Sequence, residues 1–263
     1  MLWQNDAAVP MSGLFWRRNW WSKSPRHQRI GVAALASLLL VASATSAAFA
    51  LERLHLQARL LSEFADELPA DASLHAYARQ LAEPAYADHC ASCHDQSQSK
   101  TLSPDLKSGH WIYDFGRVSD LERTILYGIR SGHGKGRNTA DMPALGITGQ
   151  LAAEEIRDVA AYVISLSRQE GDPAAIARGE KIYQGKGQCF DCHGADASGN
   201  IDWGTPGFDQ GHWLYGGDPD SVYASIHDGR HGRCPAWIGR LEPLTIRALA
   251  VFLHDNVAES PPG

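Results

Sequence analysis

The sequence predicts an all-α protein with one membrane-spanning helix near its N-terminus and two similar helical domains after it. Three observations lead to this prediction: an uncharged apolar stretch, apolar residues at helical spacing further along the chain, and a set of motifs that occurs twice. The 263 residues, 44% hydrophobic and 21% charged, are too rich in apolar side chains for a disordered chain.

The apolar stretch covers residues 30–51 and contains no charged side chain. As a helix it would reach about 33 Å, close to the hydrocarbon thickness of a bilayer. Residues 1–29 are rich in basic residues and tryptophans, which favours a cytoplasmic N-terminus. The apolar stretch would then cross a bacterial inner membrane, and everything after residue 51 would lie in the periplasm. A cleaved signal peptide stays open as an alternative, because Ala48-Phe49-Ala50 has the A-x-A cleavage pattern.

Charge is distributed unevenly along the chain. Residues 1–29 have a net charge of +4, whereas residues 52–263 carry 19 basic and 29 acidic side chains, a net charge of −10. Such an acidic part argues against nucleic acid as a partner, because phosphates would repel it. It suits docking on basic patches of other proteins.

Helical periodicity and turn residues set the expected domain boundaries. Helices are predicted over residues 73–90, 151–167, 174–183 and 244–254. The expected organisation is a linker over 52–72, a first domain over 73–168, a linker over 169–173, a second domain over 174–257 and a tail over 258–263.

Three landmarks recur in the same order in the two domains, which indicates an internal duplication. The first is C-x-x-C-H, formed by Cys90, Cys93 and His94 and again by Cys189, Cys192 and His193. The second is a Gly-His-Trp sequence ending in Trp111 and again in Trp213. The third contains Met142-Pro-Ala and, at the equivalent place, Cys234-Pro-Ala.

Each C-x-x-C-H reads as an attachment site for a c-type haem. The two cysteines form thioethers to the porphyrin, and the adjacent His94 or His193 is the proximal ligand of the haem iron. A zinc knuckle or a thiol redox pair would not need a histidine after both cysteine pairs. The sequence therefore predicts two covalent haems in two tandem cytochrome c-like domains.

Sulfur side chains are the candidates for the far side of each iron. Met142 is the one methionine after the apolar stretch, and its place in the first repeat predicts that it ligates the first haem. Cys234 occupies the equivalent place in the second repeat and is the fifth, unpaired cysteine, so it is the candidate for the second haem. His231, His227 and an open site remain alternatives to Cys234.

Side chains that could hold the haem edge also recur. Trp111 and Trp213 follow a histidine at matching points, and their ring N–H groups could reach a propionate. Arg130 and Arg230 are further candidates to pair with propionates.

With both repeats in view, roughly residues 74–256 resemble subunit III of cbb(3)-type cytochrome c oxidases. The matching stretches include Met142-Pro-Ala-Leu-Gly146, Gly211-His-Trp-Leu-Tyr-Gly-Gly217 and Pro235-Ala-Trp237. The resemblance implies a membrane anchor followed by two periplasmic cytochrome c domains. It also implies methionine where this chain has Cys234.

The resemblance implies transfer of electrons from a soluble cytochrome c or a quinol:cytochrome c reductase to a haem–copper oxidase or other membrane respiratory subunits. The chain would then be an electron-transfer subunit without catalytic residues of its own. Two alternatives stay open. One is a sulfur-compound dehydrogenase of the thiosulfate type that uses the His/Cys-ligated haem, and the other is a free periplasmic electron shuttle.

Overall fold

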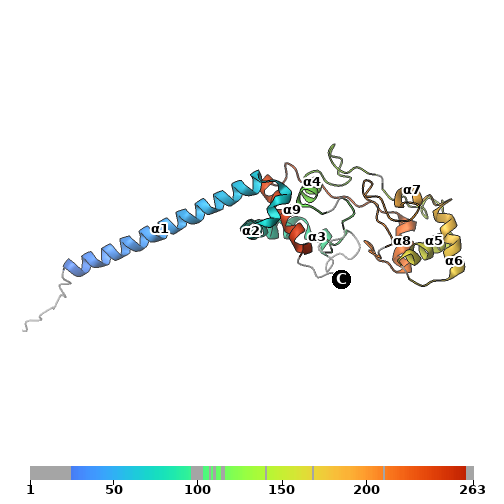
Figure 1. The fold of residues 1–263 in the computed structure, drawn as a ribbon, viewed down its shortest axis with the longest axis horizontal. Coiled ribbons are helices and arrows are strands. Elements are labelled where there is room, and N and C mark those ends of the chain that lie inside the picture. The colour runs from blue at the N-terminus through green and yellow to red at the C-terminus, as the bar shows by residue number, and fades with distance from the viewer. Residues whose placement is uncertain are drawn as a thin grey trace, which may run out of the picture. The chain divides into compact units, whose positions relative to one another are not determined.

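The computed structural model describes residues 25–95, 103–106, 108, 111–113, 116–139, 141–167, 169–209 and 211–258. The chain divides into two units, Met1–Glu52 and Arg53–Gly263. The described residues form helices and a few isolated β-bridges, and they contain no strand (Figure 1). This confirms the predicted all-α class.

Helix α1 runs from Pro25 to Ser62 and contains the apolar stretch. Its segment Ile30–Ser62 has a mean hydropathy of 2.0 over its most apolar window, long and apolar enough to cross a membrane. The large apolar side chains between Ile30 and Leu51 are exposed, as expected of a helix whose covering is lipid.

The second unit contains the remaining helices. They are η1 (Ala65–Ala70), α2 (Ala72–His89), α3 (Ala91–His94), α4 (Val118–Tyr127), α5 (Ala153–Leu166), α6 (Pro173–Tyr183), α7 (Phe190–His193), α8 (Pro219–Asp228) and α9 (Pro243–Ala258). Asp71, Asp172 and Asp218 cap α2, α6 and α8 by accepting hydrogen bonds from backbone N–H groups of the first turn. The four helices predicted from periodicity are all present, with ends that differ by up to four residues.

Residues 52–72, expected as a linker, are helical over most of their length. They form the end of α1 and the short helix η1, and they bury Leu60 and Leu68 completely. Arg247 of α9 donates hydrogen bonds to the carbonyls of Leu60 and Glu63. This segment is therefore part of the packed unit.

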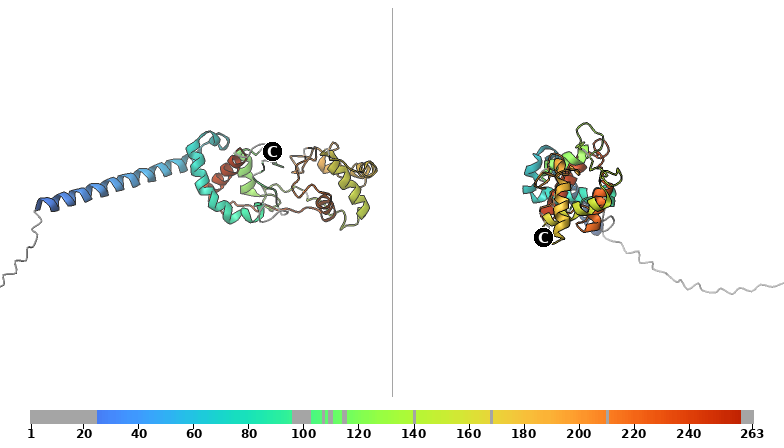
Figure 2. Two further views of the ribbon diagram at one scale, coloured as in Figure 1. Left: turned by 90° about the horizontal axis from the view of Figure 1, so that it is seen from below. Right: turned by 90° about the vertical axis from the view of Figure 1, so that its right-hand side faces the viewer.

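One hydrophobic cluster, the first core, joins α2, α4 and η1 to α9. The red ribbon of α9 lies beside the ribbons of α2 and α4 in Figure 2. The buried members of this core are Leu60, Leu68, Leu74, Tyr77, Ala78, Ala82, Tyr86, Val118, Leu121, Ala248, Leu249, Ala250, Val251, Phe252 and Leu253. The helix that completes this core is thus the last helix of the second repeat.

A separate cluster, the second core, joins α6 and α8 to α5. Its buried members are Leu145, Leu151, Ile156, Val159, Ala160, Val163, Ile164, Tyr183, Ala197, Val222 and Ile226. Here the completing helix, α5, is the last helix of the first repeat.

The two repeats therefore exchange their last helices within one chain. Backbone pairs mark where the chain crosses from one core to the other: Ile129 bridges Cys234, and Met142 bridges Arg230. The packing groups thus differ from two contiguous domains over 73–168 and 174–257. Helices α5 and α9 occupy the same position in the two repeats and have similar apolar faces. Each can therefore pack against the helices of the other repeat.

Candidate haem-binding sites

The first C-x-x-C-H motif lies at the end of α2 and in the single turn of α3. Cys90 ends α2, and the backbone N–H groups of Cys93 and His94 both donate to its carbonyl. The Nδ1 atom of His94 lies 2.9 Å from the carbonyl oxygen of Pro104. This hydrogen bond fixes the imidazole and leaves Nε2 for a metal ion.

The second motif repeats this geometry at the junction of α6 and α7. The Nδ1 atom of His193 lies 2.9 Å from the carbonyl oxygen of Pro206. The Phe208 ring lies 4.7 Å from the imidazole, and Tyr183 donates a hydrogen bond to the carbonyl of Gly194. Both motifs thus hold a histidine in one orientation through a proline carbonyl.

Burial acts on both histidines in the same way. Desolvation lowers the pKa of His94 and of His193, although the hydrogen bonds to Pro104 and Pro206 oppose this effect. Both imidazoles are therefore neutral at physiological pH, which is the form that ligates iron.

Met142 lies with the second motif. It packs against the second core together with Cys189, Phe208 and Trp213. Its backbone pairs with Arg230, where each N–H donates to the carbonyl of the other residue at 3.1 Å.

Cys234 lies with the first motif. Its backbone pairs with Ile129, and its thiol is close enough to Cys90 and Cys93 to interact with them electrostatically. Burial raises the pKa of Cys234 to about 11. Nearby, the Trp237 ring contacts His89, with ring centroids 5.0 Å apart.

The pairing of sulfurs with motifs is therefore the reverse of the sequence expectation, which placed Met142 at the first haem and Cys234 at the second. The loops that carry the sulfurs cross over together with the exchanged helices. Within the described residues, all five cysteines are free of disulfides.

The two histidines considered as alternatives to Cys234 have other partners. His231 is exposed and places Nδ1 3.2 Å from Asp141, and His227 places Nδ1 2.6 Å from Asp228. The His227 ring also stacks on Tyr223. Both side chains thus lie in surface polar contacts.

The indole of Trp213 provides a structural test of whether a haem fits. Its Nε1 atom is buried and has no acceptor among the described residues. A buried N–H donor without an acceptor is costly, and a haem propionate would satisfy it. Trp111 packs in the first core at the equivalent place, whereas the preceding His110 lies outside the described residues.

Both candidate arginines have protein partners in the structure. Arg130 donates to the carbonyl of Gly232 and pairs with Asp141, so it joins the two sulfur-bearing loops. Arg230 donates to Ser225 and lies 4.3 Å above the Tyr215 ring. Each guanidinium group thus has at least one protein partner, and Arg130 uses its Nε for both of its contacts.

Three contacts near the sites and the sulfur-bearing loops were missed by sequence reasoning. The acceptors Pro104 and Pro206 could have been found, because each follows a hydroxyl residue shortly after its C-x-x-C-H. Arg137 lies 4.9 Å above the Tyr113 ring, and burial lowers its pKa. No sequence signal pointed to Arg137. The loop before Met142 is longer than the loop before Cys234, so Arg137 has no equivalent residue in the second repeat.

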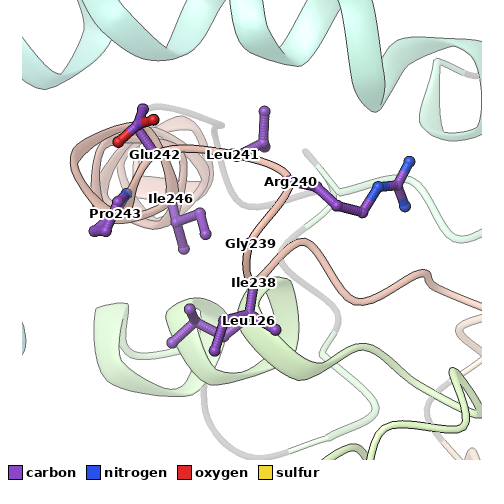
Figure 3. Close-up of a pocket in the computed structure, with 8 residues that line it drawn as sticks. All are labelled: Leu126, Ile238, Gly239, Arg240, Leu241, Glu242, Pro243 and Ile246. Atoms are coloured by element: carbon purple, nitrogen blue, oxygen red, sulfur yellow. The ribbon is translucent and has the colours of Figure 1, made fainter.

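A small pocket of about 240 Å³ lies between the end of α4 and the turn before α9 (Figure 3). Leu126, Ile238 and Ile246 supply apolar walls, and Arg240 and Glu242 are its charged members. A site for a sulfur substrate would be expected to contain a cysteine or a histidine. Neither residue type is among those that line this pocket.

Two motif-bound histidines, two sulfur donors and a helical framework define the class of protein: a c-type cytochrome with two haem-attachment sites. Family models agree with this class, and they match each repeat separately. Residues 81–167 match cytochrome c, and residues 174–253 match cytochrome c oxidase, cbb3-type, subunit III.

Whole-chain comparisons identify the family. The chain is 35% identical over 211 residues to the cbb3-type cytochrome c oxidase subunit CcoP of Azospirillum sp. (strain B510), covering 76% of this chain and 70% of the relative. It is 30% identical over 208 residues to CcoP of Cereibacter sphaeroides, covering 79% and 71%. The chain belongs to the family of cbb3-type cytochrome c oxidase subunits FixP and CcoP.

The FixP subunit of Bradyrhizobium sp. (strain ORS 278) is 39% identical over 194 residues, which is 72% of this chain and 64% of the relative. The alignment thus spans slightly less than two thirds of that relative's length. Family membership, together with the apolar part of α1, makes the chain a membrane-anchored subunit.

Proposed function

We propose that this chain is the dihaem electron-transfer subunit of a cbb3-type haem–copper oxidase. Electrons enter from a soluble cytochrome c or a quinol:cytochrome c reductase and leave toward the catalytic subunit. The observation that carries the proposal is the repeated site, in which a proline carbonyl holds the histidine and a sulfur side chain lies near the cysteines of each motif. When bound, each haem iron accepts and releases one electron.

The proposed ligand sets follow from the crossed loops. Cys90, Cys93 and His94 attach and ligate the first haem, and Cys234 supplies the far ligand. Cys189, Cys192 and His193 attach and ligate the second haem, with Met142 as the far ligand. Trp111 and Trp213 would lie near the haem edges, and the buried N–H of Trp213 would donate to a propionate.

These ligand sets predict different potentials for the two sites. A thioether opposite histidine favours the ferrous state, whereas an anionic thiolate stabilises ferric iron. The second site would therefore be the high-potential site, and the first would be the low-potential site.

The compartment is part of the proposal. Residues 30–51 anchor the uncleaved chain in the bacterial inner membrane, residues 1–29 lie in the cytoplasm, and both haem sites lie in the periplasm. The basic residues before the apolar stretch support this orientation. Mass spectrometry of the native N-terminus tests it, and a chain that begins after Ala50 would contradict the anchor.

Purification from membranes tests the proposed function. The full chain should copurify with a haem–copper subunit, and low-temperature EPR with a redox titration should show two low-spin haems of different potential. A chain that always purifies alone, or one that thiosulfate reduces rapidly, would contradict an oxidase subunit and favour a shuttle or a sulfur-compound dehydrogenase.

A further inference from the structure

The segment around the second haem motif carries an unusual charge. Residues 187–229 contain seven aspartates and no lysine or arginine. The equivalent 43 residues around the first motif, 88–130, contain six acidic and five basic side chains. The two repeats thus have similar landmarks but net charges of −7 and −1 over these stretches.

All seven aspartates of the second stretch are exposed in the structure. They are Asp191, Asp196, Asp202, Asp209, Asp218, Asp220 and Asp228. Stabilisation of the fold explains only some of them, such as Asp218, which caps α8. The others add to a negative field over the surface of the second core.

An exposed apolar turn lies within this acidic surface. Trp203 is 47% exposed and Ile201 is 42% exposed, and Asp202 stands between them. A backbone bridge between Asn200 and Thr205 closes the turn. The turn therefore presents two large apolar side chains among exposed aspartates.

The turn is attached directly to the haem-binding residues. The Thr205 hydroxyl donates to the carbonyl of Cys192 at 2.5 Å, and the N–H of Gly199 donates to the carbonyl of His193 at 2.9 Å. On another side, Gly204 approaches the Tyr113 ring so closely that an added Cβ would overlap it. The turn is therefore held in place beside the cysteine and histidine of the second motif.

An apolar centre with an exposed tryptophan, surrounded by charge of one sign, has the composition of a protein–protein interface. A surface of anionic lipids would be repelled by these aspartates. A partner with a lysine-rich face would be attracted at long range and then oriented by the apolar contact.

We propose that the surface formed by Ile201, Trp203 and the aspartates of residues 187–229 is the docking site for a soluble, lysine-rich electron-carrier protein. The carrier approaches the second haem motif through this turn and delivers its electron there. This inference rests on the proposed function, because it names the site at which the electron donor binds.

Electron delivery to the full chain in its oxidase complex tests the proposal. The donor is a ferrous, lysine-rich mitochondrial cytochrome c, mixed by stopped flow at several ionic strengths. The variant Asp196→Asn/Asp202→Asn/Asp209→Asn should lower the second-order rate constant by about tenfold at low salt and flatten its salt dependence. Trp203→Ala should lower the rate constant with the salt dependence unchanged.

The matched control is Glu67→Gln/Glu83→Gln/Asp88→Asn, which removes three exposed acidic groups from η1 and α2. This control should retain the rate constant within about twofold of the parent. Equal losses in both triple variants, or no loss in the first, would overturn the docking site. A first variant that fails to assemble with its oxidase would also overturn it, since the acidic surface would then contact a subunit of the complex.

A second assay separates this proposal from the proposed function. Oxygen consumption driven by ascorbate and a small diffusible mediator does not require protein docking. Mediator-driven turnover that persists in the docking variants, with slow delivery from the cytochrome, supports the docking site. Absence of mediator-driven turnover in the parent complex would overturn the proposed function itself, whereas unchanged cytochrome kinetics would overturn only the docking site.

Discussion

Cys234 and Met142 differ in the charge that they would place on an iron, and this difference decides how the two sites behave. The thiol of Cys234 is half-buried beside Cys90 and Cys93, and without metal its raised pKa keeps it protonated. The thioether of Met142 carries no proton to lose. Under the proposed ligand sets, this single side chain would make two sites with the same histidine geometry unequal.

Replacing the thiol tests this inequality. Cys234→Met should raise the lower of the two potentials, by on the order of 0.1–0.5 V, because a neutral thioether replaces an anionic ligand. The measurement is a redox titration of the full chain followed by EPR. Two similar His/Met signals are expected, and an unchanged low potential would contradict ligation by Cys234.

A matched pair of variants assigns each sulfur to its haem. In a chain with Cys189→Ala and Cys192→Ala, one haem remains, attached at the first motif. Its EPR signal should change on Cys234→Met and stay the same on Met142→Leu. The opposite response would restore the pairing that the sequence alone predicts.

At the scale of elements, the contact between α5 and α6 depends on one glycine. A Cβ added at Gly179 would lie 1.9 Å from the carbonyl oxygen of Asp158, so the two helices can approach only without a side chain there. Arg178 reinforces the contact with two hydrogen bonds of 2.7 Å to the buried carboxylate of Asp158. The exchanged helix α5 is thus fitted specifically to α6.

Gly179→Ala should therefore destabilise the second core by about 1–3 kcal/mol, the usual cost of overpacking. Denaturant unfolding of the full chain measures the loss. Gly134→Ala is the control, because nothing lies within 4 Å of an added Cβ there. Equal stability of the two variants would contradict the close approach of α5 and α6.

A second inter-element contact gives a pH-dependent prediction. Burial tends to raise the pKa of Asp66, but hydrogen bonds from the backbone and hydroxyl of Ser119 outweigh it and hold the pKa below its ordinary value of 3.8. The carboxylate therefore stabilises the fold above pH 3.8, and this contribution is lost as the pH falls through the lower folded pKa.

Asp66→Asn should cost about 0.5–1 kcal/mol at neutral pH, a small value because the pair is exposed to solvent. The difference from the parent should vanish in acid, as measured by urea unfolding between pH 2 and pH 7, a range set by the usual carboxyl pKa of about 4. Glu67→Gln on the same helix is the control. A cost independent of pH would show that the charge of Asp66 is irrelevant.

Most helices and both haem motifs were predictable, because periodicity and motif spacing are local properties of the sequence. The partners of α5 and α9 were not. Ile156 and Val159 on α5 present the same kind of apolar face as Ile246 and Leu249 on α9, so either helix suits either core by pattern alone. Close-packing details such as Gly179 decide between them, and they are visible only in three dimensions.

At the scale of the whole second unit, the exchange predicts that mutations act across the repeat boundary. Leu249→Ala, in the second repeat, removes a buried side chain from the first core and should perturb the first haem. Ile156→Ala, in the first repeat, should perturb the second haem. Each should cost about 2–4 kcal/mol by leaving a cavity.

Thermal unfolding followed separately at the two haem EPR signals checks this prediction. Each variant is the control for the other, because the chemistry of the substitution is similar and the cores differ. Perturbation of the haem within the mutated repeat would contradict the exchange.

The helix exchange also constrains how the protein matures. Helix α9 follows every helix of the second core in the chain, yet it completes the first core, against which Cys90 of the first C-x-x-C-H motif packs. That motif therefore stays open to the haem-attaching machinery after the second core already has all of its helices. Biogenesis would then run opposite to chain order, with the second site completed before the first.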